Sequence, residues 1–146
     1  MWKWDTLSKA NLDSVYMGTA LLYAKQSKAT RAKVGAVLVT KTGVVIPGYN
    51  GTPIGTDNTC EDVDNVTLPE TIHAETNCVL KAAREGISVV DSVLYVTLAP
   101  CQTCAAMLLQ AGVSKIVFRE FYRNSLGLNY LRKYGKEVIQ YDPIEN

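Results

Sequence analysis

Histidine is scarce in this 146-residue sequence, where His73 is the only one. A second histidine-containing zinc site within one chain is therefore excluded. Cysteine is also scarce, with four residues and a single C-x-x-C pair. Closed structural zinc sites typically use two paired ligand clusters, so a single pair argues against such a site. Without a secretory context, four cysteines indicate reduced thiols or metal ligands rather than a disulfide framework.

The sequence also lacks an excess of charge of one sign and a long apolar run. Its 15 Lys and Arg nearly balance its 14 Asp and Glu, for a net charge of +1. Proteins that coat a duplex need a strong basic face, so we expect no nucleic-acid partner. The longest apolar stretches are far short of a membrane span, and the start at 1–5 is not followed by the apolar region of a signal peptide. We therefore expect a cytoplasmic protein with no membrane partner.

The chain is long enough for a sizeable core, with 47% hydrophobic residues, and we expect one domain over residues 1–146. Apolar spacing and turn residues predict four helices, at 12–25, 71–85, 101–110 and 126–134, and five strands, at 34–39, 44–46, 89–97, 115–118 and 137–141. Asn11 is the expected N-cap of the first helix. The pair Pro47-Gly48 is expected to end the second strand, and a long polar loop to follow it as far as Leu68. This order of elements predicts an α/β fold of three layers, with helices on both faces of a five-stranded mixed sheet.

The most informative pattern is His73-Ala-Glu75, followed by Pro100-Cys101-x-x-Cys104. This H-x-E…P-C-x-x-C arrangement is the signature of zinc nucleobase deaminases, in which the glutamate is not a zinc ligand. One imidazole nitrogen and two thiolates leave a tetrahedral zinc with one open position for water. Each ligand is expected in the first turn of a helix, where the partial positive charge of the helix N-terminus favours the thiolate form of cysteine.

Two other interpretations of these residues stay open at this point. A closed structural zinc site would need Cys60 or Cys78 as its fourth ligand, and a bare C-x-x-C can also be a redox pair. The position of Glu75 needs an assumption too. Two residues after His73, a regular helix would point its side chain roughly the other way, so we expect both side chains to reach past the end of the helix.

The predicted chemistry is hydrolytic deamination. Zinc lowers the pKa of a bound water toward neutrality and so provides hydroxide at physiological pH. Glu75 would take the proton of that water, deliver it to a ring nitrogen, and help to protonate the leaving ammonia. The hydroxide would add to the carbon that bears the amine.

Beyond the zinc motif, five stretches make the sequence similar to the deoxycytidylate (dCMP) deaminases of the cytidine deaminase superfamily. They are residues 31–39, 48–55 with its Gly-Tyr-Asn-Gly, 73–75, 97–104, and 121–124 with its Tyr-Arg-Asn. The zinc motifs by themselves indicate only the superfamily. The histidine ligand also differs from free-cytidine deaminases, which typically use a third cysteine. The resemblance implies a cytidine deaminase-like fold and conversion of dCMP to dUMP and ammonia.

The resemblance also assigns substrate contacts. It implies that Asn50 binds the deoxyribose hydroxyl and that the Ala74 backbone N–H contacts the pyrimidine edge. Arg31, Tyr122 and Arg123 would hold the 5′-phosphate, which suits the fork of a guanidinium and the directional donor of a phenol. The alternatives are solvated surface charge for either arginine and a turn residue for Asn50.

Members of this family are regulated, activated by dCTP with magnesium and inhibited by dTTP, usually as hexamers. The resemblance therefore implies a homo-oligomer, and an effector site at Gly48, Tyr49 and Gly51 where Mg²⁺ can accompany the nucleotide. Trp2, Lys3 and Trp4 are further candidates for that site, although packing against the first helix is the favoured role of the tryptophans. Longer relatives carry a second zinc with extra histidines in insertions that this chain lacks.

Two further functions compete with this hypothesis. One is a related zinc deaminase that acts on a nucleoside, a free base or adenosine in tRNA; the tRNA enzyme would need a basic groove that the charge balance does not suggest. The other is a non-catalytic zinc module that binds nucleotides, in which Glu75 would have no chemical role.

Overall fold

The computed structural model describes residues 9–142, which form four helices and five strands. The helices are α1 (Lys9–Ala24), α2 (Ala74–Arg84), α3 (Gln102–Ala111) and α4 (Leu126–Lys133). The strands are β1 (Gly35–Val39), β2 (Val45–Tyr49), β3 (Val93–Leu98), β4 (Lys115–Glu120) and β5 (Glu137–Gln140). The predicted order of elements is confirmed. None of the described helices is long and apolar enough to cross a membrane.

The strands form one mixed sheet in the order β2-β1-β3-β4-β5. β1 pairs antiparallel with both β2 and β3, whereas β3, β4 and β5 run parallel. β1 lies inside the sheet, and four of its five residues are buried. Its continuous apolar sequence, Gly-Ala-Val-Leu-Val, is typical of a strand covered on both faces.

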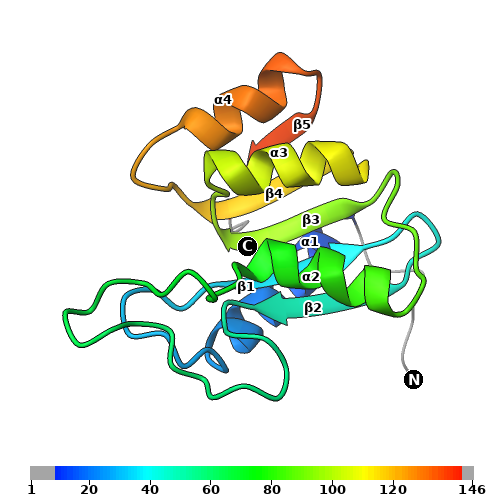
Figure 1. Cartoon of the computed structure of the whole chain (residues 1–146). Helices are drawn as coiled ribbons and strands as arrows, with labels where there is room; N and C mark the ends of the chain where they lie inside the picture. Colours follow the sequence, from blue (N-terminus) through cyan, green and yellow to red (C-terminus); the bar gives the residue numbers. More distant parts are fainter. Residues whose placement is uncertain (1–8, 143–146) are drawn as a thin grey trace.

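Helices cover both faces of the sheet, so the predicted three-layer α/β fold is confirmed (Figure 1). On one face, Met17 and Ala20 of α1 pack with Val37, Tyr95 and Val117. On the other face, α2, α3 and α4 enclose the larger core. Its fully buried side chains include Leu38, Leu94, Leu108, Ile116, Phe118 and Leu131.

The prediction that Pro47-Gly48 ends the second strand is wrong, because β2 continues to Tyr49. β2 is an edge strand, and edge strands tolerate proline because its missing N–H costs no hydrogen bond on the unpaired side of the strand. Gly48 is required by packing. A Cβ there would lie 2.8 Å from the Ala74 carbonyl oxygen and 2.9 Å from the Cys78 sulfur. The absence of a side chain thus lets α2 lie close against β2.

Other helix and strand boundaries also differ from the predicted ones. α1 begins at Lys9, so Asn11 lies inside the helix and is not its N-cap. β3 begins at Val93 rather than Val89, because the chain turns at Asp91, whose φ is 60°. α2 begins at Ala74, later than the predicted 71 or 72. The candidate residues Trp2, Lys3 and Trp4 lie outside the described residues.

The polar segment between β2 and α2 is more ordered than the predicted loop. Two isolated antiparallel bridges, Gly51 with Ile72 and Glu61 with Thr67, join parts of this segment to each other. Between Glu61 and Thr67 the chain makes a tight hairpin in which Asp62 Oδ1 accepts hydrogen bonds from the N–H groups of Asp64 and Val66. This 61–67 hairpin forms one wall of the cavity described next.

Candidate metal centre and substrate cavity

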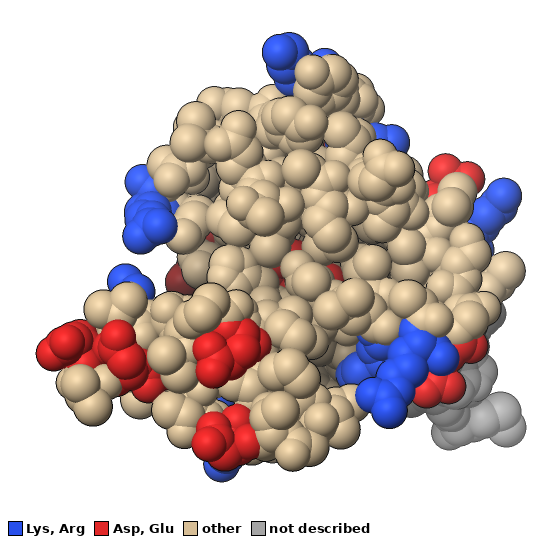
Figure 2. Space-filling view, viewed as in Figure 1, with Lys and Arg blue, Asp and Glu red and all other residues tan. Residues whose placement is uncertain are grey.

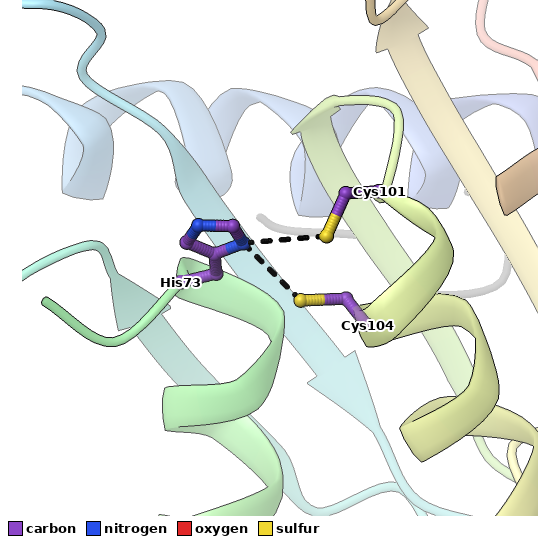
Figure 3. A group of neighbouring side chains, drawn as sticks. All are labelled: His73, Cys101 and Cys104. Carbon is purple, nitrogen blue, oxygen red and sulfur yellow. Dashed lines mark hydrogen bonds between the residues drawn. The ribbon is translucent and has the colours of Figure 1, made fainter. Parts of the chain in front are cut away.

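The three predicted metal ligands converge at the N-termini of α2 and α3 (Figure 3). His73 and Cys101 are the N-cap residues of these helices, and both have extended backbone conformations. Cys104 lies in the first turn of α3. Their ligand atoms all lie within 4.8 Å of one another. α2 and α3 sit on the same face of the sheet, and this brings together residues that are 28 and 31 positions apart in sequence.

The separations between these atoms fit a tetrahedral zinc. His73 Nδ1 lies 3.2 Å from Cys104 Sγ and 3.7 Å from Cys101 Sγ. With a Zn–N bond of about 2.0 Å and a Zn–S bond of about 2.3 Å, tetrahedral geometry places such atoms about 3.5 Å apart. Among the described residues, no other His, Cys, Asp or Glu joins this group of three. The donor set therefore suits a zinc ion that keeps one position for a non-protein ligand.

The other two cysteines do not complete a closed site. Cys60 and Cys78 are free, buried thiols that do not belong to the ligand group. Cys78 packs in the core between α2 and β2, as the position of its side chain beside Gly48 requires. Burial raises the pKa of its thiol to about 12, so it stays protonated. The alternative of a structural zinc with Cys60 or Cys78 as fourth ligand is therefore not supported.

The C-x-x-C pair has the asymmetry expected of two thiols that share a proton. The pKa of Cys101 falls to about 4, because the Cys104 thiol and then His73 hydrogen-bond to its thiolate. The pKa of Cys104 rises, because it is the hydrogen-bond donor to Cys101 and is buried. One thiolate is thus already favoured before a metal replaces the shared proton.

Glu75 lies in the first turn of α2 and is only 3% exposed. The pKa of its carboxyl is raised, chiefly by burial, while its own backbone N–H and the His73 imidazole partly oppose the shift. On a regular helix, side chains two residues apart would point in roughly opposite directions. His73 and Glu75 avoid this, because His73 precedes the helix with a ψ of 155° and does not follow helical spacing. Glu75 is also not one of the ligand group. A buried carboxyl with a raised pKa has the property that general acid–base catalysis requires.

A cavity of about 550 Å³ opens beside the ligand cluster and is lined by His73 and Cys101. All five predicted substrate-binding residues line the same cavity: Arg31, Asn50, Ala74, Tyr122 and Arg123. Figure 2 shows basic side chains on either side of a recess at the left edge of the molecule. The described ion pairs involve neither arginine of the cavity. The guanidinium of Arg123 lies over the Tyr122 ring, 5.2 Å from its centroid.

Asn50 has a structural role in addition to its place in the cavity. Its Oδ1 accepts a hydrogen bond from the Val34 N–H, and its Nδ2 donates to the Ala32 carbonyl. Its own carbonyl accepts from Ser27 Oγ, which is 1% exposed. Asn50 therefore fixes the segment that carries Arg31, and it is more than the turn residue that was the alternative.

The three predicted effector residues, Gly48, Tyr49 and Gly51, line a second cavity of about 450 Å³. Lys81 and Arg84, in the last turn of α2, line it as well. Tyr49 and Gly51 of this second cavity are the chain neighbours of Asn50, which lines the substrate cavity. The packing role of Gly48 against α2 is sufficient to explain that glycine without a ligand.

Sequence reasoning missed the part of the cavity wall that comes from the 61–67 hairpin. Glu61 and Thr67 line the cavity from this hairpin. Both carboxylate oxygens of Glu61 accept hydrogen bonds from the Thr30 N–H, at 2.7 and 3.2 Å, and Thr67 Oγ1 accepts one from Arg31. No local motif marks these residues, since their role depends on contacts with residues more than 30 positions away in the sequence.

The comparisons with known proteins agree with this geometry. Residues 10–120 match the family model of the cytidine and deoxycytidylate deaminase zinc-binding region. The chain belongs to this family.

Among curated members of the deaminase family, a deoxycytidylate deaminase of Enterobacteria phage T4 is 31% identical, over 86% of this chain and 88% of the phage protein. That of Schizosaccharomyces pombe is 33% identical over 98% of this chain, but the chain spans about half the length of that relative (51%). A solved structure of the dCMP deaminase of cyanophage S-TIM5, in complex with dCMP and dUMP, is 39% identical with a TM-score of 0.87. The match covers 92% of this chain and all of the cyanophage chain. The family and the cytidine deaminase-like fold inferred from the sequence are confirmed.

Proposed function

We propose that the chain hydrolyses dCMP to dUMP and ammonia at the cavity beside His73, Cys101 and Cys104. The observation that carries the proposal is that the metal-ligand cluster and two arginines that take part in none of the described ion pairs open into one cavity. Support also comes from the cyanophage relative, whose structure holds dCMP and dUMP. The reaction adds the elements of water to the substrate and releases ammonia, so it needs no oxidant or second substrate.

His73, Cys101 and Cys104 would hold the zinc. When bound there, the metal supplies Lewis acidity that lowers the pKa of a water molecule toward neutrality. Glu75 accepts the proton of the attacking water and passes it to the pyrimidine ring nitrogen. The water oxygen then bonds to the ring carbon that bears the amine. Glu75 takes the remaining proton of that oxygen and transfers it to the leaving amine as the carbon–nitrogen bond breaks. One carboxyl serves both steps because it passes its proton on each time.

The remaining residues bind and orient the nucleotide. Arg31, Tyr122 and Arg123 would bind the 5′-phosphate with charge-assisted hydrogen bonds. The Ala74 N–H belongs to the first turn of α2, whose N–H groups have no partner within the helix, and it would donate to the pyrimidine edge. Asn50 uses one N–H on Ala32 and retains the other, which would bind the deoxyribose hydroxyl.

The proposal includes regulation at the second cavity. Gly48, Tyr49 and Gly51 would contact an effector nucleotide, with dCTP and Mg²⁺ activating and dTTP inhibiting a homo-oligomer, for which a hexamer is the expected form. Lys81 and Arg84 give that cavity positive charge suited to a polyphosphate. A reducing cytoplasmic setting suits a chain whose cysteines are all free thiols.

The decisive experiment measures ammonia release from the zinc-loaded chain with dCMP and with deoxycytidine as separate substrates. We expect turnover of dCMP and a kcat/KM for deoxycytidine lower by at least about 100-fold, because the arginines lose their phosphate partner. The opposite preference would indicate a nucleoside deaminase. Zinc binding without release of ammonia from either substrate would indicate a non-catalytic module.

Regulation is tested separately with the same assay. The rate at subsaturating dCMP should rise with dCTP and Mg²⁺ and fall with dTTP, and sedimentation should show an oligomer. Rates that respond to neither nucleotide would remove the effector site from the proposal and leave the catalytic assignment intact.

A further inference from the structure

A hydroxyl group lies beside one of the metal ligands and has no place in the proposed reaction. Thr76 Oγ1 is 3.4 Å from Cys104 Sγ, across the gap between the first turns of α2 and α3. Thr76 is partly buried, and it does not line the substrate cavity. It therefore touches the ligand sulfur without access to the substrate.

The helix gives this hydroxyl no local partner. A helical threonine usually bonds back to the carbonyl three or four residues earlier. Here the Ile72 carbonyl accepts from the N–H of Gly51 at 3.0 Å and the His73 carbonyl from the Asn77 N–H at 2.9 Å, and neither accepts from the Thr76 hydroxyl. The only hydrogen bond found for the Thr76 hydroxyl among the described residues is the one to sulfur.

The Cys104 sulfur can accept a hydrogen bond from this hydroxyl. A metal-bound cysteine is a thiolate and can only accept hydrogen bonds, so the Thr76 O–H must be the donor. Cys104 is 5% exposed, and two of its other side-chain partners, His73 Nδ1 and Cys101, are themselves predicted metal ligands. Cys101 is more exposed and can be reached by water. The Thr76 hydroxyl is thus placed to donate a hydrogen bond to the Cys104 thiolate when the metal is bound.

We infer that Thr76 is a positioning residue of the metal centre, which donates a hydrogen bond to the Cys104 thiolate. The inference rests on the metal centre of the proposed function and not on its substrate. The hydrogen bond orients the sulfur and draws electron density from it, so the sulfur donates less to the metal and the metal remains the stronger Lewis acid. Such partners of metal ligands commonly change metal affinity or activity by about 10- to 100-fold.

The test compares Thr76→Val, Thr76→Ser and the wild-type chain after substitution with Co²⁺, whose thiolate-to-cobalt charge-transfer band reports directly on the sulfur. Valine has the shape of threonine without its hydroxyl, and serine keeps the hydroxyl. We expect the band of Thr76→Val to move to longer wavelength, because the sulfur electrons are no longer stabilised by the hydrogen bond. Its zinc affinity, measured by competition with a chelator, should fall by about 10-fold, because the loss of a fixed sulfur position outweighs the gain in electron donation. Thr76→Ser should restore the wild-type band.

Thr19→Val is the matched control, because Thr19 is a helical threonine of α1 whose hydroxyl bonds back to the Val15 carbonyl. It should leave the band and the zinc affinity unchanged. A Thr76→Val band identical to that of the wild type would overturn the inference. If this variant does not fold, Thr76→Ala provides the same comparison with the same two outcomes. A wild-type chain with no thiolate-to-cobalt band at all would instead overturn the proposed metal centre.

Discussion

At the scale of single residues, Glu75 combines two demands that oppose each other. Its carboxyl must be ionised to accept a proton, yet it is buried where the charged form is disfavoured. The raised pKa that results makes the protonated form of this carboxyl easier to reach than that of a solvated glutamate. Burial would weaken a residue whose only role was to add negative charge to the first turn of α2, because burial disfavours the charged form.

Replacement of Glu75 by Gln tests this role. The amide keeps the shape of the side chain but cannot carry a proton between water and substrate, so kcat for dCMP should fall by about 10²- to 10⁴-fold. Zinc content, measured by mass spectrometry, should stay at the wild-type level because Glu75 is not in the ligand group. A Glu75→Gln enzyme with near-normal kcat would contradict the assignment, and loss of zinc would place Glu75 among the ligands.

Arg31 provides a second prediction at this scale. Removal of its charge by Arg31→Gln should weaken binding of the phosphate by about 1.5 to 3 kcal/mol, which corresponds to roughly 10- to 100-fold in KM for dCMP. The matched control is Arg119→Gln, since Arg119 is paired with Glu120 and does not line the substrate cavity. Steady-state kinetics decide the point. An equal effect of both substitutions would indicate a general loss of positive charge rather than a phosphate contact.

At the scale of elements, the contact between β2 and α2 positions the histidine ligand. Gly48→Ala would place a methyl group within 3 Å of the Ala74 carbonyl and the Cys78 sulfur. We expect the free energy of unfolding to fall by about 1 to 3 kcal/mol, the usual range for overpacking. Gly51→Ala is the control, because no atom of residues 9–142 beyond Gly51 and its two chain neighbours lies within 4 Å of the added Cβ, and the φ of Gly51 is not positive. Urea denaturation measures both, and equal stability of the two variants would mean that α2 can move away without cost.

The 61–67 hairpin is the second element that acts on the cavity. Glu61 accepts hydrogen bonds from the N–H and the hydroxyl of Thr30, next to Arg31. Glu61→Ala should release this segment and raise KM for dCMP more than kcat changes, because the role proposed for the segment is to bind the phosphate and not to transfer protons. Glu70→Ala removes an exposed carboxylate of the same polar segment outside the hairpin and should leave both constants unchanged. Unchanged KM in Glu61→Ala would show that Arg31 holds its position by other contacts.

At the scale of the whole molecule, the buried carboxyl links stability to pH. An unfolded glutamate titrates near pH 4.3, whereas the folded pKa of Glu75 is higher. Above about pH 4 the unfolded chain therefore releases a proton that the folded chain still holds. This group's favourable contribution is complete below the unfolded pKa and is lost as the pH rises through the folded pKa.

Metal-free wild type and metal-free Glu75→Gln should consequently diverge with pH. The variant should become the more stable of the two, by a margin that grows from about pH 4 upward and levels off above the folded pKa. Chemical denaturation at a series of pH values, with a chelator present, measures the difference. Since both chains contain the same thiols and imidazole, a margin independent of pH would show that burial does not raise the pKa of Glu75.

Much of this protein follows from local patterns in its sequence. The spacing of apolar residues between turn residues predicted every helix and strand. Helices and strands bury apolar side chains at different spacings, so the spacing identifies the element. The order of these segments predicted the mixed sheet. His73, Glu75, Cys101 and Cys104 could be named from spacing, since zinc chemistry allows few combinations of ligand types.

Only the tertiary structure decided how these residues work together. The extended backbone of His73 frees it from helical spacing, and Gly48 continues a strand that Pro47 was expected to end, because α2 packs there. The hairpin that carries Glu61, the hydrogen bonds of Asn50 to Ala32 and Val34, and the approach of Thr76 to Cys104 all join positions that are distant in the chain. A sequence pattern reports the preferences of neighbouring residues, whereas burial and hydrogen bonding between distant segments exist only once the layers have packed.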